Sequence, residues 1–421
     1  MVLTMKKTII CSLIAIVIGA VMGAVSGLFG RALEFISEIH EKYYLFLTPF
    51  LGAAGIAIIF LYKKFSPYSQ QGLDLAIEYQ MGEVDDKGVV KDFGHARKIG
   101  KFPKGYAVLK IFNNLLMILF GASTGKEGTI AQCGAAIGDY ASRIFKSRKY
   151  SQLLLISGVS AALGGLFQTP LGGLFFALEF AATGVLFYEA VIPALISSYA
   201  ACAVSKLCGY SAFSFAVSLD GDLSSLQIFY LVIGAAVFGL IGRCFAELLG
   251  RARMLYGKKV KDPYIGIFVS GCIIAVVLML LHGGRYSGTG ENIITGIFSG
   301  EGFYIYDFAL KLIFTIICVS IGYTGGEMTP LIAIGASAGA ALSQISGLPL
   351  DVSAAVGAAA VYGAATNTLL APIFIGIEMF GGSIAPYIAL SCVIAFAVNG
   401  NKSIYGAQRH VIRSLYSVLK K

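Results

Sequence analysis

The sequence predicts an all-α integral membrane protein made of two related halves, each with broken and tilted transmembrane helices. Hydrophobic residues make up 57% of the 421 residues and charged residues only 13%, a balance that soluble domains do not show. The phrase Thr-Gly-x-Glu-x-Thr occurs at 124–129 and again at 324–329, each time with a carboxylate in an apolar region. The chain also holds 52 glycines, and small residues let helices approach closely in a bilayer.

Apolar runs recur along the chain at lengths that suit a hydrocarbon core of roughly 30 Å. They are 8–28, 45–62, 108–121, 226–249, 265–281, 308–322 and 388–398. Some of these runs are too short to cross a bilayer alone, which indicates tilted or half-membrane helices. The first run lacks a small-residue cleavage site and leads into further spans, so we expect a retained helix rather than a signal peptide.

The two halves are predicted at about 8–209 and about 224–416. In each half the repeated phrase begins a glycine-rich helix, which is followed by a second helix and then by one that ends in an acidic residue, Glu179 or Glu378. We expect an odd number of crossings per half, so the halves should lie antiparallel in the membrane. The expected organisation is one transmembrane domain over 1–421 without a soluble C-terminal domain.

The net charge of +9 does not indicate nucleic-acid binding, because the basic residues lie in loops and at chain ends rather than on one face. Lys6 and Lys7 precede the first apolar run, and Lys63 and Lys64 follow the second. The positive-inside rule therefore predicts cytoplasmic termini. The charged loop 83–104 is expected to be a solvated cytoplasmic connection, with a regulatory role as the alternative.

Glu127 lies where the first copy of the phrase begins a helix. A helix N-terminus offers unpaired N–H groups and a partial positive charge, so it binds anions. Glu127 either offsets this dipole, or its carboxylate competes with a transported anion and leaves when it is protonated. Ionisable residues inside a membrane are rare and usually functional, which favours the second interpretation. Lys126 beside it either steers anions or pairs with an acid at the surface.

The arrangement of these features indicates a transporter or channel rather than an enzyme. A repeated, glycine-interrupted membrane architecture places its substrate site at the interface between the halves. No nucleophile and base pair, phosphate loop or metal-ligand spacing accompanies the acids in the sequence, so no enzyme, metal or cofactor is expected. An arginine ladder typical of a voltage sensor is also missing from the sequence.

At several of these motifs the chain resembles the CLC family of anion channels and transporters. The segment 125–129 is similar to the family signature Gly-Arg/Lys-Glu-Gly-Pro, and 325–330 stands where the family has Gly-x-Phe-x-Pro. The Pro170 helix, the helix start at 288–292 and Tyr405 follow in family order. The resemblance covers essentially the whole membrane region. It implies a CLC-type antiparallel repeat and a homodimer with one pore per subunit.

The resemblance also implies roles for individual residues. Glu127 would be the gating and proton-carrying glutamate, and Tyr405 would offer a phenolic hydroxyl to the anion. Glu327 and Thr329 are expected between Glu127 and the cytoplasm, with helix capping as the alternative for Glu327. The implied anion path comprises Leu73, Gly125, Lys126, Gly128, Thr129, Met328 and Tyr405.

Departures from the common family pattern resemble its fluoride-exporting branch. The family motif Gly-Ser-Gly-Ile-Pro is replaced by 72–76, with Leu73 in place of the serine that faces the ion. Phe180 stands where chloride/proton exchangers carry an internal glutamate. Thr129 replaces the proline of the first signature, and the second signature carries a Glu and a Thr.

The sequence therefore predicts a secondary transporter that exchanges fluoride for protons across a bacterial plasma membrane of the inner-membrane type. A chloride/proton antiporter and a passive chloride/fluoride channel of the same fold are the alternatives. The expected partners are fluoride or chloride ions, protons, the lipid bilayer and a second copy of the chain.

Overall fold

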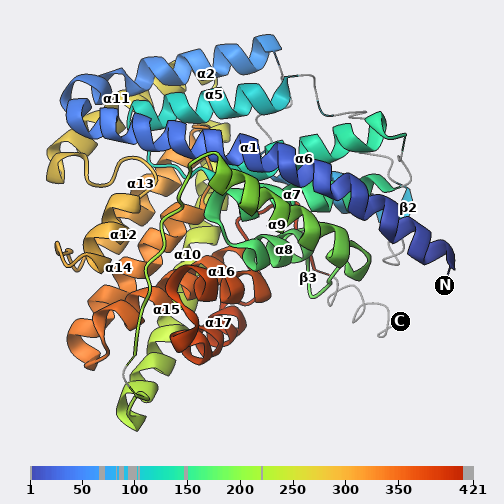
Figure 1. The fold of residues 1–421 in the computed structure, drawn as a ribbon. Helices are drawn as coiled ribbons and strands as arrows, with labels where there is room; N and C mark the ends of the chain where they lie inside the picture. Colours follow the sequence, from blue (N-terminus) through green and yellow to red (C-terminus); the bar gives the residue numbers. More distant parts are fainter. Residues whose placement is uncertain are drawn as a thin grey trace, which may run out of the picture.

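The chain is almost entirely helical in its computed structural model, which describes residues 2–65, 72–81, 83–84, 90–92, 102, 105–146, 150–219 and 221–410 (Figure 1). The described strands form two short pairs. β1 (Glu83–Val84) pairs antiparallel with β2 (Val90–Asp92), and β3 (Ala182–Thr183) pairs parallel with β4 (Arg409–His410). The predicted all-α class is confirmed. Most of the charged loop 83–104 lies outside the described residues, so its role stays a prediction.

Two series of helices follow one another along the chain, separated by a long connection. The first comprises α1 (Val2–Leu47), α2 (Leu51–Phe65), α3 (Asp74–Met81), α5 (Tyr106–Leu119), α6 (Glu127–Ile144), α7 (Ser151–Phe167), α8 (Pro170–Glu179) and α9 (Val191–Leu207). The second comprises α10 (Ser225–Lys259), α11 (Pro263–Leu280), α12 (Glu291–Phe298), α13 (Asp307–Ser320), α14 (Met328–Ser346), α15 (Leu350–Thr366), α16 (Leu370–Phe380) and α17 (Ala385–Asn399). Short 3₁₀ turns lie at Thr48–Phe50, Tyr188–Ala190, His282–Gly284 and Gly382–Ile384.

Membrane crossing is supported by the length and hydropathy of these helices. Six segments among the described residues are long and apolar enough to span a bilayer: Thr8–Phe65, Tyr188–Leu207, Ser225–Lys259, Pro263–Leu280, Met328–Ser346 and Gly382–Asn399. Shorter apolar helices, among them α7, α8, α15 and α16, lie between them. The molecule is therefore a multi-pass membrane protein with both full-length and shorter helices, as the apolar runs predicted.

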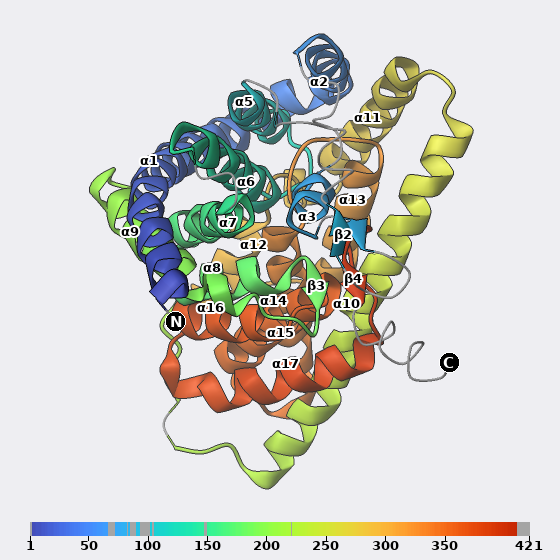
Figure 2. The ribbon, with the colours of Figure 1, turned by 90° about the vertical axis from the view of Figure 1, so that its right-hand side faces the viewer.

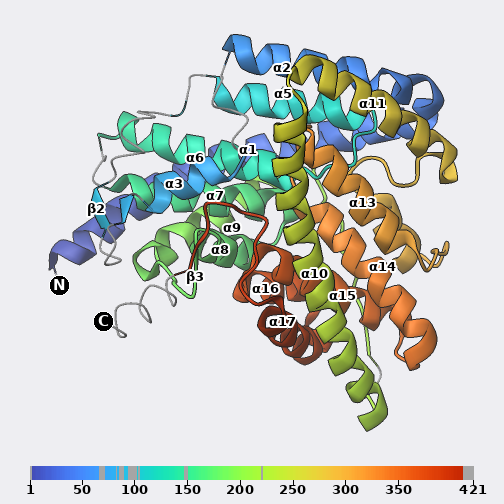
Figure 3. The same ribbon diagram turned by 180° about the vertical axis from the view of Figure 1, so that it is seen from behind.

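Long helices flank the molecule. Figure 2 shows α1 and α9 on one side and α10 and α11 on the other. α10 runs along the second series and packs against α13, α15 and α17 (Figure 3). Near the C-terminal end of α10, Arg253 reaches Glu327 at the start of α14.

Glycine contacts of the same kind join a helix pair in each series. Gly134 of α6 lies against Gly158 of α7, and Gly335 of α14 lies against Gly357 of α15, so closely that a Cβ at any of these positions would meet the facing backbone. Small residues permit such approach where the hydrophobic effect cannot drive helices together. The division of the chain into halves at the boundaries given above stays a prediction.

The acids that end α8 and α16 cap each other's helices. Glu179 accepts hydrogen bonds of 3.0 Å from the N–H groups of Leu370 and Ala371 at the start of α16. Glu378 accepts from the N–H groups at the start of α8, at 3.0 Å and 2.8 Å. A carboxylate at a helix N-terminus satisfies donors that have no partner within the helix. This reciprocal pair locks the two short helices side by side.

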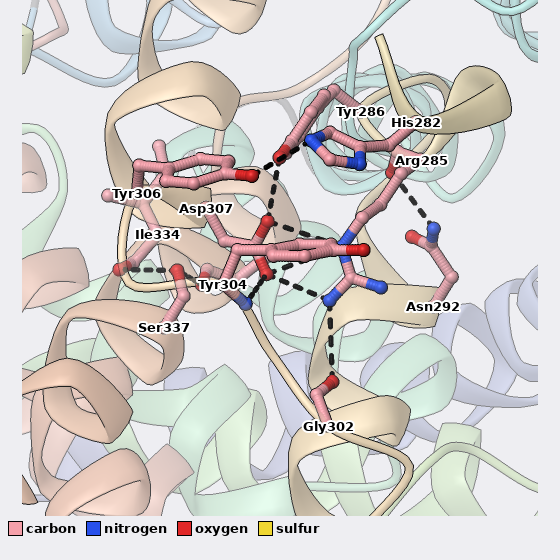
Figure 4. A network of polar contacts seen from close by, with 11 residues as sticks. His282, Arg285, Tyr286, Asn292, Gly302, Tyr304, Tyr306, Asp307, Ile334 and Ser337 are labelled. Carbon is pink, nitrogen blue, oxygen red and sulfur yellow. Dashed lines mark hydrogen bonds and ion pairs between the residues drawn. The ribbon is translucent and has the colours of Figure 1, made fainter. Parts of the chain in front are cut away.

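A polar cluster fixes the connection between α11 and α12, as Figure 4 shows. The fully buried Asp307 accepts hydrogen bonds from Arg285 Nη2 (2.8 Å), the Tyr286 hydroxyl (2.8 Å) and the Tyr304 N–H (3.0 Å). Lys311, one turn further along α13, donates from Nζ to the carbonyl of Gly288 at 2.8 Å. A buried charge costs free energy unless it is paired and hydrogen-bonded, and these contacts meet that need. The cluster thereby holds the N-terminus of α12 in place.

Candidate functional site

The two copies of the repeated phrase meet inside the protein. The Gly125 N–H donates to the Gly326 carbonyl at 2.6 Å, and the Gly326 N–H donates to the Gly125 carbonyl at 2.9 Å. Asn114 of α5 supports the pair, because its Nδ2 donates to the carbonyls of Gly125 (3.0 Å) and Thr324 (3.2 Å). The N-termini of α6 and α14 therefore lie next to each other.

Within the described part of the chain, neither helix begins with a side-chain cap of its own. Ser224 caps α10 in a capping box with Gln227, whereas Lys126 and Glu327, the N-cap residues of α6 and α14, make no side-chain cap bond among the described residues. The unsatisfied N–H groups and partial positive charge of a helix N-terminus attract anions. Two such ends side by side form a region whose donors and partial positive charge suit an anion.

Glu127 fills this region. Its side chain is buried, and its Oε2 accepts a hydrogen bond of 3.1 Å from the Lys126 N–H. A Cβ on Gly326 would come within 2.9 Å of the same oxygen, so glycine is needed there to admit the carboxylate. The second oxygen, Oε1, has no hydrogen-bond partner among the described residues. The carboxylate thus occupies a place that a small anion could take.

Three hydroxyl groups around this region are also unpaired. Thr129, Thr329 and Tyr362 are fully buried, and none of their hydroxyl oxygens has a hydrogen-bond partner among the described residues. Thr129 and Thr329 lie in the first turns of α6 and α14, and Tyr362 lies on α15, which packs against α14. Buried polar groups are normally paired, so each exception needs an explanation. A ligand that accepts hydrogen bonds would provide one.

A cavity of about 470 Å³ leads to Glu127 from one side. Its wall contains six of the residues singled out in the sequence: Leu73, Glu127, Gly128, Glu327, Met328 and Tyr405. They come from the starts of α3, α6 and α14, with Leu73 and Glu327 each directly before its helix, and from the segment after α17. Among the described residues, Gly125, Lys126, Thr129 and Thr329 do not line it. The structure therefore brings six of the predicted residues, Glu127 among them, to the wall of one cavity.

Leu73 and Tyr405 form neighbouring parts of the cavity wall. The α3 residue after Leu73, Asp74, accepts a hydrogen bond of 3.0 Å at Oδ1 from the Ala407 N–H, which ties α3 to the segment that carries Tyr405. The Tyr405 ring meets Phe176 edge-on, with centroids 6.4 Å apart. Phe180 is fully buried and stacks on Phe176. An apolar ring therefore fills the position at which the resemblance to chloride/proton exchangers would imply an internal glutamate.

Lys126 points away from the cavity. Its Nζ lies 2.5 Å from Glu291 Oε1 at the start of α12 and donates to the Tyr210 hydroxyl at 3.3 Å. The sequence left open whether Lys126 steers anions or pairs with an acid at the surface. It does pair with an acid; the Lys126 side chain is buried, whereas that of Glu291 is 31% exposed. Steering of anions by Lys126 stays a prediction.

Several residues of the site were not anticipated from the sequence. Arg253 of α10 donates from Nη2 to Glu327 Oε1 at 2.8 Å, and both line the cavity. Lys110 of α5 also lines it, buried with its Nζ 5.3 Å from the centroid of the Tyr62 ring. Lys110 could have been found from the sequence, because it is a charged residue inside the apolar run 108–121. Arg253 carried no such signal, because it is one of several basic residues near the end of a long helix.

Paired helix N-termini around a buried glutamate in an all-helical membrane protein are features that suit an ion transporter. A sequence profile of the family described as "Voltage gated chloride channel" matches residues 54–400. The chain therefore belongs to this family, the CLC channels and transporters, whose members move ions and are not enzymes.

Individual relatives agree with this membership. The chain is 31% identical to a "Chloride/fluoride channel protein" of Pseudomonas syringae pv. tomato, over 80% of this chain and 76% of that protein. It is 26% identical to the H(+)/Cl(-) exchange transporter ClcA of Vibrio cholerae, over 94% and 88%. The fold matches a crystal structure of a CLC-type fluoride/proton antiporter with a TM-score of 0.89 and 34% identity, over 95% and 98%. A slow cyanobacterial Cl⁻/H⁺ antiporter shares the fold, with a TM-score of 0.80, 19% identity and 98% of each chain covered.

Proposed function

We propose that this CLC protein is a secondary active antiporter that exports fluoride in exchange for protons. The observation that carries the proposal is the set of unpaired polar groups at the two meeting helix N-termini: Glu127 Oε1 and the hydroxyls of Thr129 and Thr329. Fluoride is small and is a strong hydrogen-bond acceptor, so a site that strips its water must supply close donors. The likeness to a fluoride/proton antiporter over 95% of the chain supports the same assignment.

Selectivity for fluoride over chloride would come from several positions together. Leu73 removes a hydroxyl that suits the larger chloride, whereas Thr129, Thr329 and Tyr405 offer O–H donors. One neutral hydrogen bond contributes only about 1 kcal/mol net, and a hundredfold preference requires about 2.7 kcal/mol. The proposed preference therefore rests on the whole donor set and on the width of the path.

Glu127 is the proposed proton carrier. As a carboxylate it occupies the anion region between α6 and α14, and once protonated it leaves, so that anion and proton take turns. Glu327 and Thr329 are the proposed next members of the route on the cytoplasmic side, because Phe180 cannot accept a proton. Glu327 lines the same cavity as Glu127, which supports this order.

The proposed setting follows from the same reasoning. We infer a homodimer with one pathway in each subunit, the two halves of each subunit antiparallel, and both termini on the cytoplasmic side of a bacterial inner membrane. The second candidate function is chloride/proton antiport, which the likeness to a Vibrio cholerae H(+)/Cl(-) exchange transporter over 94% of the chain favours. A passive chloride/fluoride channel of the same fold is the third.

Proteoliposomes that hold the purified protein distinguish these functions. Initial efflux of fluoride and of chloride is measured at equal gradients while the internal pH is recorded. The proposal predicts that fluoride leaves at least about tenfold faster, a difference of about 1.4 kcal/mol in activation free energy, and that protons move inward against a gradient. Chloride efflux as fast as fluoride efflux, or faster, would identify chloride as the substrate. Anion efflux without proton movement would indicate a channel.

A further inference from the structure

Arg253 connects three parts of the cavity wall. From α10 it donates through Nη2 to Glu327 Oε1 at 2.8 Å and through Nη1 to the Ile404 carbonyl at 3.4 Å. Glu327 precedes α14, and Ile404 precedes Tyr405 in the chain. The Arg253 side chain is 40% exposed, while the Glu327 side chain is 12% exposed. Arg253 therefore reaches from the open part of the cavity to a largely enclosed carboxylate.

Other charged groups of the cavity do not replace this contact. Asp74 on α3, Glu127 on α6 and Lys110 on α5 line the same space, but among the described residues the ion pair of Glu327 is with Arg253. Two of these neighbours are carboxylates and disfavour a further negative charge. Burial also disfavours the charged form of a carboxyl group, and a cation in contact favours it. The charge of Glu327 therefore depends on Arg253.

We propose that Arg253 is a positioning residue that keeps Glu327 ionised and fixed at the cavity wall, ready to take the proton from Glu127. This inference rests on the antiport function proposed above. The O–H bond of protonated Glu127 breaks, and the proton binds to the Glu327 carboxylate. Neutral Glu327 no longer pairs with Arg253, turns towards the cavity and releases the proton to water. Arg253 then binds the carboxylate again.

The test compares the pH profile of fluoride-driven proton uptake in proteoliposomes holding the wild type, Arg253→Gln or Arg253→Lys. Arg253→Gln leaves Glu327 without its cation, which disfavours the carboxylate, so the profile moves to higher pH by about one to three pH units. Arg253→Lys keeps the charge and moves the profile less in the same direction. Arg251→Gln is the matched control, because Arg251 of the same helix is exposed and pairs with Glu247 at 3.2 Å.

A double variant tests whether Arg253 acts through Glu327. The rate of coupled transport in the double variant Arg253→Gln/Glu327→Gln should equal the rate in Glu327→Gln alone. A further tenfold loss in the double variant would show that Arg253 acts independently of Glu327 and would overturn the inference. An unchanged profile in both single variants would also overturn it while leaving the antiport function standing. If the wild-type protein moves fluoride without protons, both the antiport function and the role of Arg253 are refuted. Gel filtration of each variant checks folding. If Arg253→Gln does not fold, the pH profile of Arg253→Lys alone decides whether the inference stands.

Discussion

At the residue scale, the proposed functional core is a small set of buried polar groups that have no hydrogen-bond partner among the described residues. Glu127 Oε1, the Thr129 and Thr329 hydroxyls and the Tyr362 hydroxyl belong to it. A hydroxyl that is buried without a partner costs about 1 to 3 kcal/mol. A site that keeps such groups open retains binding capacity at the expense of stability.

Glu327 and Thr329 are predicted to act in transport rather than only at a helix end. Glu327→Gln removes titration and Thr329→Val removes the hydroxyl with little change in shape, so each should slow fluoride-coupled proton uptake at least about tenfold, or about 1.4 kcal/mol in the barrier. The assay is proton uptake by proteoliposomes under a fluoride gradient. Thr295→Val, at an exposed position of α12, is the control. Near-normal rates in both variants would refute a transport role for Glu327 and Thr329.

Tyr362 provides a prediction about stability. Its buried hydroxyl has no partner among the described residues, so Tyr362→Phe should leave the thermal unfolding temperature in detergent unchanged or raise it. The Tyr106 hydroxyl, in contrast, donates to Gln132 at 2.8 Å, and Tyr106→Phe should lose about 1 kcal/mol. Each variant lacks only the phenolic oxygen of the tyrosine that it replaces. An equal loss of stability in both would show that the Tyr362 hydroxyl is paired.

At the scale of elements, the junction of α6 and α14 depends on glycine. A Cβ at Gly326 would meet Glu127 Oε2 at 2.9 Å and the Gly128 N–H more closely still. Gly326→Ala is therefore expected to displace the carboxylate or separate the two helix ends, and fluoride flux should fall by at least about tenfold. Gly250→Ala on α10 has open space around its Cβ and should transport normally. Equal flux in the two variants would argue against close packing at this junction.

The sequence predicted elements better than their ends. The helix starts near Glu127 and Glu291 were visible, since a glycine-rich turn and an acid in the first turn mark them. The run 45–62 suggested one span, but α1 ends at Leu47 and α2 begins at Leu51, with Pro49 in the 3₁₀ turn between them. α10 continues beyond the predicted 249 as far as Lys259, because charged residues can extend a helix that leaves the apolar layer.

Contacts between distant elements could not be read from the sequence. The pairing of Lys126 with Glu291 joins α12 to the start of α6, and that of Arg253 with Glu327 joins α10 to the start of α14. Hydropathy and motif spacing carry no information on which charged side chains meet after folding. The meeting of the two copies of the repeated phrase, in contrast, could be predicted from the sequence. In a protein built from two related halves, both copies are expected at the interface between the halves.

At the scale of the whole molecule, Glu127 separates two charged regions. One is the cavity with Glu327 and Arg253 in its wall. The other contains Lys126 and Glu291, neither of which lines that cavity among the described residues. We propose that an ion crossing the protein passes between these regions at the place where the Glu127 carboxylate lies. The central claim is therefore that Glu127 gates the anion and carries the proton.

Fluoride-driven proton pumping by Glu127→Gln tests that claim most directly. The glutamine keeps the shape of the side chain but cannot titrate. In proteoliposomes with an outward fluoride gradient, wild-type protein should drive protons inward against their own gradient. Glu127→Gln is predicted to show no such uptake at any pH, whatever fluoride flux remains. Proton uptake against a gradient by Glu127→Gln, at a rate close to that of the wild type, would contradict the account.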